Sequence, residues 1–176
     1  MKRRTYKNGY NSTHEISKSM AILKQITICK SDGEYILFPE SRNVIGLWIA
    51  HTPCFVISAN KIRNLNKSIK DALQYSNSGL LVEENLPQKV LMELHVKSWN
   101  ALYKNYKIYS ISLTESNIII TPWKYSQKGM FPDTESKCIF AFHDIDYIGE
   151  MFAALINNDQ SHNGEFIELY PIVKED

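Results

Sequence analysis

The sequence predicts an α+β fold, an antiparallel or mixed β-sheet with about three helices packed on it in a single domain. The 176 residues, of which 44% are hydrophobic and 22% charged, match the size and composition of one globular domain. Strand signals and helix signals are grouped along the chain, which argues against regular βαβ alternation. The strand-like runs are short and bounded by turn residues, as in a sheet built largely from hairpins.

The N-terminal third predicts a basic arm followed by strands. Residues 1–18 are polar and basic without apolar periodicity, so we expect a mobile arm before a domain at residues 19–176. The turn Ser31-Asp32-Gly33 predicts a hairpin whose second strand stops at Pro39. The wholly apolar run at 44–49 is typical of a central strand covered on both faces. Strands are thus expected at 22–28, 35–38, 44–49 and 55–57.

Helical periodicity appears in three later segments. One begins near Asn64 and ends at Gly79, with its apolar positions on one face. Another begins at Pro87, which suits a first turn, and continues to about Asn105. The last has Asp144 as its expected cap and repeats apolar residues to Ile156.

The remaining segments predict strands and one long loop. Residues 108–113 and 118–121 are expected to form a hairpin. A loop rich in Gly, Pro and polar residues is expected at 124–137 and contains aromatic side chains. Short strands are expected at 138–142 and 166–170.

The sequence carries no motif of a common catalytic or cofactor-binding site. His51 with Cys54, and Cys138 with His143, are isolated pairs, so we expect no metal centre. The seven glycines are never within three residues of one another, which excludes phosphate-binding loops. We therefore expect no enzyme activity and no cofactor. The odd number of cysteines, three, argues against a disulfide framework and favours the cytoplasm, and no apolar run is long enough to span a membrane.

Charge is distributed unevenly along the chain. Residues 1–70 hold 12 Lys and Arg against 4 Asp and Glu, whereas residues 71–176 hold 8 against 15. This asymmetry fits either two solvated faces or an acidic docking face for a basic partner.

The acidic third offers candidate binding residues. The carboxylates there bracket a short strand and open a helix, so they can share one edge of the sheet. Trp123 and Phe131 lie on the expected loop as possible apolar anchors, or fold back over the sheet. The candidate site therefore comprises Trp123, Phe131, Asp133, Glu135, Asp144, Asp146 and Glu150.

Nucleic-acid binding through the basic half is the alternative. Lys2, Arg3, Arg4 and Lys7 are interleaved with Tyr6 and Tyr10, which could contact phosphates and stack on bases. The acidic third would repel a long polyanion, so we expect no nucleic-acid partner. If the acidic face is only solvated, Lys61, Arg63 and Lys67 become the candidate binding residues.

Three segments resemble a known family. They are the Trp99–Tyr106 helix end, the Asn117–Pro122 strand and the stretch from Ile148 to Leu155. Together they resemble immunity proteins of contact-dependent growth inhibition systems (CdiI), over roughly residues 65–156. The resemblance implies a cytoplasmic, non-enzymatic protein that binds and neutralises the C-terminal toxin domain of a cognate effector, often a nuclease. A basic nuclease surface would suit an acidic docking face.

Overall fold

A computed structural model describes residues 21–77, 85–126 and 129–158. The helix expected to end at Gly79 ends at Tyr75 instead. The arm expected at 1–18 and the strand expected at 166–170 lie outside the described residues. Within them, the chain forms the α+β domain that the sequence predicts.

One antiparallel sheet of eight strands organises the molecule. Its spatial order is β3-β2-β1-β5-β6-β7, while β4 also pairs with β2 and β8 also pairs with β6. The long strands β2 and β6 therefore each hold two short strands along their outer edges. The bounds are β1 Lys24–Lys30, β2 Glu34–Arg42, β3 Trp48–Ala50, β4 Phe55–Ser58, β5 Lys107–Leu113, β6 Asn117–Ser126, β7 Gly129–Pro132 and β8 Cys138–Ala141.

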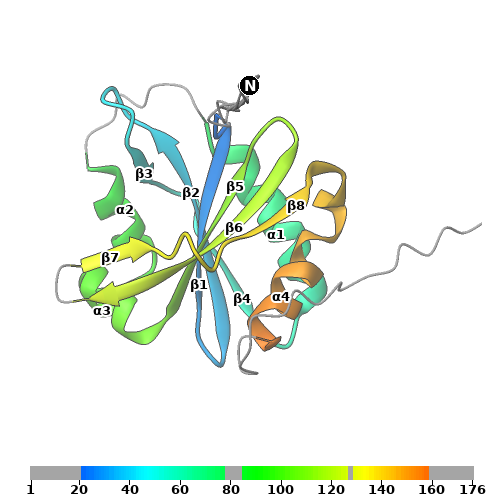
Figure 1. Ribbon diagram of the computed structural model, residues 1–176. Coiled ribbons are helices and arrows are strands. Elements are labelled where there is room, and N and C mark those ends of the chain that lie inside the picture. The colour runs from blue at the N-terminus through cyan, green and yellow to red at the C-terminus, as the bar shows by residue number, and fades with distance from the viewer. Residues whose placement is uncertain (1–20, 78–84, 127–128, 159–176) are drawn as a thin grey trace, which may run out of the picture.

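Helices cover both faces of the sheet (Figure 1). On one face lie α1 (Ile62–Tyr75), the 3-10 helix η1 (Phe142–Tyr147) and α4 (Ile148–Asn158). Their core includes Leu65, Ile69 and Phe152. On the other face lie α2 (Leu86–Glu93) and α3 (Trp99–Asn105), which pack a smaller core with Phe38 and Ile108.

The predicted helix from Pro87 to Asn105 is wrong in one respect, because it is two helices. His95 adopts a positive φ of 54°, and the Val96 N–H donates to the Leu91 carbonyl at 2.9 Å, which closes α2. Ser98 then caps α3 by accepting a hydrogen bond from the Ala101 N–H at 3.2 Å. The apolar period continues across the break, so periodicity alone does not reveal it.

The prediction of a central strand at 44–49 is also wrong. Residues 43–47 form an exposed turn, in which the Asn43 side-chain oxygen accepts hydrogen bonds from the Ile45 and Leu47 N–H groups. Ile45 is 74% exposed, and only β3 at the end of the run joins the sheet. The strand expected to stop at Pro39 instead continues to Arg42, pairing Pro39 with Ile26.

The loop expected at 124–137 is in part a strand pair, because β6 extends to Ser126 and pairs with β7. Asp144 is not the expected cap, because the N-cap of η1 is Ala141. It lies within η1, and α4 begins four residues later at Ile148.

The closest helix approach on the larger face joins α1 to α4 at Gly149. The Gly149 N–H donates to the Asn66 side-chain oxygen at 3.0 Å, and a Cβ added to Gly149 would lie 2.5 Å from the Asn66 backbone nitrogen. The backbone of α1 cannot yield without displacing Leu65 and Ile69 from the core.

We therefore expect Gly149→Ala to lower the free energy of unfolding by about 1–3 kcal/mol, because the added methyl overpacks the helix contact. Thermal unfolding measures this loss as a fall of about 2–4 °C for each kcal/mol. Gly33→Ala is the matched control, since a Cβ there meets nothing within 4 Å. Equal melting temperatures for the two variants would contradict the close helix approach.

Candidate protein-binding surfaces

Trp123 and Phe131 lie on the β6–β7 hairpin. Trp123 is half-buried against the core under α2 and α3, and its indole N–H donates to the Ser110 hydroxyl at 3.1 Å. Phe131 faces solvent with 45% of its surface exposed. Of the two expected anchors, Phe131 is thus free to enter a partner pocket, whereas Trp123 is held by its own sheet.

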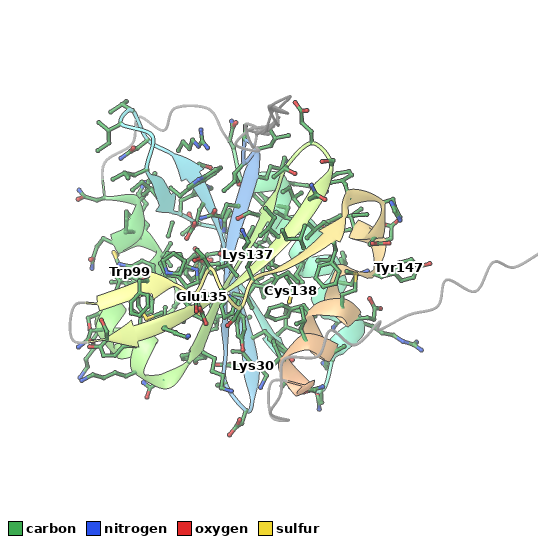
Figure 2. The ribbon with its side chains drawn as sticks, viewed as in Figure 1. Lys30, Trp99, Glu135, Lys137, Cys138 and Tyr147 are labelled. Atoms are coloured by element: carbon green, nitrogen blue, oxygen red, sulfur yellow. The ribbon has the colours of Figure 1, made fainter. Side chains whose placement is uncertain are left out.

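Asp133 follows β7 and already forms an ion pair within the chain. It is 7% exposed, and its carboxylate lies 2.7 Å from the Lys124 amine. The hydrogen bond from Lys124, helped by Ser136, lowers the pKa of the Asp133 carboxyl below its ordinary value. Glu135, two residues on, is exposed. Figure 2 places Glu135 near Lys137 on the segment that leads from β7 to β8.

Asp144, Asp146 and Glu150 lie on η1 and the first turn of α4. Asp144 lies 3.3 Å from the His143 ring, and Asp146 lies 2.9 Å from the Lys70 amine on α1. Asp146 also accepts a hydrogen bond at its carbonyl from the Asn66 side chain. Glu150 is exposed.

The candidate residues form two groups along the edge of β6. The short strand β7 pairs with Trp123–Ser126, and β8 pairs with Asn117–Ile120. Trp123, Phe131 and Asp133 therefore lie toward one end of β6, and η1 with α4 lies beyond β8 at the other (Figure 1). The structure brings each group together but does not merge them into one patch.

The α2–α3 face of the sheet also holds a buried polar network that the sequence does not predict. The Glu40 carboxylate accepts hydrogen bonds from the Gln25 amide and, at 2.6 Å, from the Thr27 hydroxyl. The Gln25 side-chain oxygen in turn accepts from Ser112 at 2.9 Å. Burial raises the pKa of Glu40 above its ordinary value, although both donors oppose the shift. The alternation of Gln25 and Thr27 with isoleucines was the only signal for it.

The nucleophilic side chains of this region are unsuited to catalysis. Burial raises the pKa of the Cys29 thiol and raises that of Cys54 to about 12, so neither is a thiolate at neutral pH. The Ser41 hydroxyl lies 2.8 Å from His51 Nε2, but Ser41 is 0% exposed and a substrate cannot reach it. This pair fastens β2 to the segment after β3.

Within the described ranges, no three His, Cys, Asp or Glu side chains gather as metal ligands. None of the described helices is long and apolar enough to cross a membrane.

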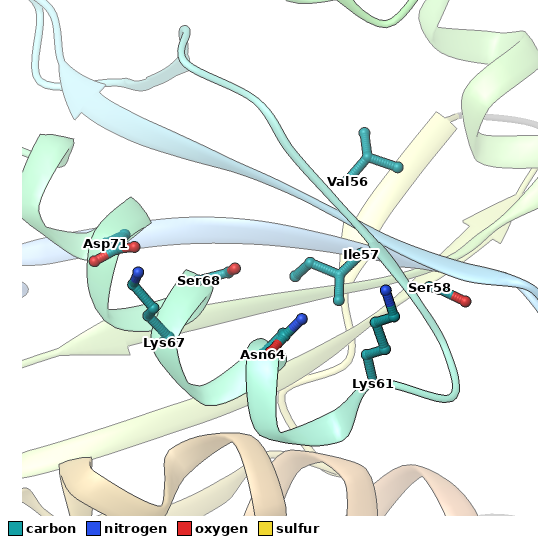
Figure 3. A pocket seen from close by; sticks show the side chains of 8 residues that line it. All are labelled: Val56, Ile57, Ser58, Lys61, Asn64, Lys67, Ser68 and Asp71. Atoms are coloured by element: carbon teal, nitrogen blue, oxygen red, sulfur yellow. The ribbon is translucent and has the colours of Figure 1, made fainter.

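A groove between β4 and α1 is lined by lysines. It has a volume of about 390 Å³, and both Lys61 and Lys67 line it beside Asn64 (Figure 3). Arg63 lines an adjoining hollow that shares Lys61 and Asn64. We call these four residues the basic groove; three of them are the alternative binding residues of the sequence analysis.

The Glu40 network predicts an unusual pH dependence of stability. Because the folded-state pKa of Glu40 lies above the unfolded value near 4.5, the folded protein binds more protons in the interval between them. The contribution of the Glu40 carboxyl to the free energy of unfolding is therefore fully present below about pH 4.5. It is lost as the pH rises through the folded-state pKa of Glu40.

We expect Glu40→Gln to keep its stability where the wild type loses stability with rising pH. The free energy of unfolding of the variant minus that of the wild type should therefore grow as the pH rises from about 4.5 to 7. Urea unfolding across this pH range measures the difference. A difference that stays constant with pH would show that Glu40 titrates normally in the folded protein.

No protein-family model and no curated protein matches the sequence. Among solved structures, the fold is similar to that of a Neisseria meningitidis protein of unknown function, with a TM-score of 0.58 and 15% identity over 76% of this chain and 94% of that one. It is also similar to a chain of the CdiA-CT/CdiI toxin and immunity complex from Yersinia pseudotuberculosis. There the TM-score is 0.52 and the identity 13%, over 78% of this chain and 97% of that one. At these identities the comparisons establish a shared fold.

Proposed function

We propose that this protein is a cytoplasmic immunity protein that binds and neutralises the C-terminal toxin domain of a contact-dependent growth inhibition effector. The observation that carries the proposal is the similarity of fold to a chain of a toxin and immunity complex, which extends over 78% of this sequence. The resemblance of the Trp99–Tyr106, Asn117–Pro122 and Ile148–Leu155 segments to the same family supports it independently of the fold.

The chemistry of the surface supports action by binding rather than by catalysis. Desolvation raises the pKa of both the buried Cys29 thiol and the half-buried Cys54 thiol, and the Ser41–His51 pair is buried inside the fold. In contrast, Phe131 on β7, Glu135 between β7 and β8, and Glu150 on the first turn of α4 are exposed. Exposed carboxylates of this kind suit a partner with a basic active-site cleft, and we propose a nuclease toxin on this ground.

Co-expression tests this function directly. The C-terminal domain of a candidate effector, sought among the genes next to this protein's own gene, is produced in bacteria with and without the protein. We expect growth arrest by the toxin domain alone and normal growth when both are present. We also expect the purified protein to bind a catalytically inactive form of the domain. A toxin domain that arrests growth regardless of this protein, and does not bind it, would refute the proposal.

The exposed carboxylates are expected to steer association. Glu135→Lys and Glu150→Lys should each slow association with the inactive toxin domain several-fold at low salt, and the double variant by about tenfold, with a flatter salt dependence. Stopped-flow or surface-based kinetics measures these rates.

Asp32→Lys is the control, because Asp32 is exposed in the β1–β2 turn, outside both candidate groups. If all three substitutions slow association equally, only the net charge matters and the candidate surface is wrong.

A further inference from the structure

The basic groove follows the line where β4 lies beside α1. The chain leaves β4 at Ser58 and turns into α1, so the N-terminal end of α1 lies beside the end of the strand. Figure 3 shows Lys61 at that end, Asn64 in the middle and Lys67 beside Asp71. Because α1 rises about 1.5 Å per residue, Lys61 and Lys67 are about 9 Å apart along its axis.

The cations of this groove have no partners within the chain segments that the structure describes. The side chains of Lys61, Arg63 and Lys67 make no hydrogen bond or ion pair there. By contrast, Lys70 and Lys124 each neutralise a carboxylate, Asp146 and Asp133 respectively. Two of the five carboxylates in the acidic candidate set are thus already paired with lysines, whereas these three cations remain available to a ligand.

The position of two of these cations is unfavourable for the helix that carries them. The first turn of α1 contains no acidic residue, and its N-cap, Lys61, makes no side-chain capping hydrogen bond. Positive charge at a helix N-terminus opposes the helix dipole, and carboxylates are stabilising there instead. Lys61 and Arg63 therefore do not serve the stability of α1, which points to a role in binding.

The rest of the groove is suited to a peptide. Ile57 points toward α1 and is only 7% exposed, Val56 on the other side of β4 is 59% exposed, and Asn64 and Ser68 offer neutral polar groups. No aromatic side chain is among the described residues that line the groove, so a nucleic-acid base would have nothing to stack on there. These features favour an acidic protein segment over nucleic acid.

We propose that the basic groove binds an extended, carboxylate-bearing segment of the partner toxin domain, an inference that rests on the proposed function. An extended chain advances about 3.3 Å per residue and its side chains alternate between two faces, so two carboxylates two residues apart, about 6.6 Å, can both face the groove. The long side chains of Lys61 and Lys67 can reach inward to span the remaining difference. The exposed carboxylates of the acidic candidate set then attract the basic cleft of the toxin domain. The basic groove adds a second contact, in which this protein supplies the positive charges and the toxin domain the negative ones.

The test compares the full-length protein with the double variant Lys61→Glu/Arg63→Glu, using the inactive toxin domain as the probe. We expect the variant to bind at least tenfold more weakly at low salt. Its melting temperature should rise by about 1–4 °C, since the new carboxylates suit the helix dipole. The control variant, Lys97→Glu/Lys107→Glu, changes the net charge equally at exposed lysines away from the groove and should bind within twofold of wild type.

The outcomes separate this inference from the proposed function. If the wild-type protein does not bind the toxin domain, the proposed function fails. If it binds and the groove variant binds equally well, only the groove assignment is overturned. A loss of binding together with a fall in melting temperature would also overturn it, because the loss would then reflect damage to α1.

Carbodiimide coupling identifies the occupant. In the complex, we expect mass spectrometry to find amide cross-links from Lys61 or Lys67 to aspartate or glutamate of the toxin domain. Cross-links in the isolated protein to its own residues 159–176, or to a second copy of the chain, would overturn the proposal. RNA binding that is abolished by Lys61→Glu/Arg63→Glu would overturn it in favour of nucleic acid.

Discussion

The structure depends on the antiparallel pairing of β1 with β5 at the centre of the sheet. Residues 25–29 of β1 are buried on both faces, and Lys24–Lys30 pairs residue by residue with Lys107–Leu113. A strand covered on both sides requires helices on both faces, which α1 with α4 and α2 with α3 provide. Burial of this strand also removes the side chains of Gln25 and Thr27 from water. Glu40 and Ser112 supply the hydrogen-bond partners that these side chains then need.

This central pairing leaves the candidate binding surfaces at the periphery. Because β2 and β6 each carry two short strands on their outer edges, the chain turns repeatedly there and exposes side chains on a fixed framework. The carboxylates of η1 and α4 lie on one side of α1, where Lys70 contacts Asp146, and the basic groove lies along β4 on another. Helix α1 thus separates two surfaces of opposite charge, and such a pair can fix the orientation of a partner as well as attract it.

The sequence was sufficient for the fold class, most strands and the apolar faces of α1 and α4, because hydrophobic periodicity reports burial directly. It was insufficient where burial and hydrophobicity diverge. Val44 and Ile45 are apolar yet exposed, since Asn43 closes a turn before they can enter the sheet, while Gln25 and Thr27 are polar yet buried through hydrogen bonds to Glu40. For the candidate site, the sequence supplied the charged residues but not their partners. Asp133 pairs with Lys124 of the neighbouring strand β6, and Asp146 pairs with Lys70, which lies 76 residues earlier in the chain.

The central claim is that a rigid sheet presents a partner-binding surface on either side of α1. Hydrogen–deuterium exchange at short labelling times, with and without the inactive toxin domain, tests it most directly. We expect binding to slow exchange at residues 61–68, 129–135 and 142–150 while the amides of β1 and β5 are unchanged. Slower exchange confined to α2 and α3, with no change in any of those segments, would contradict the account.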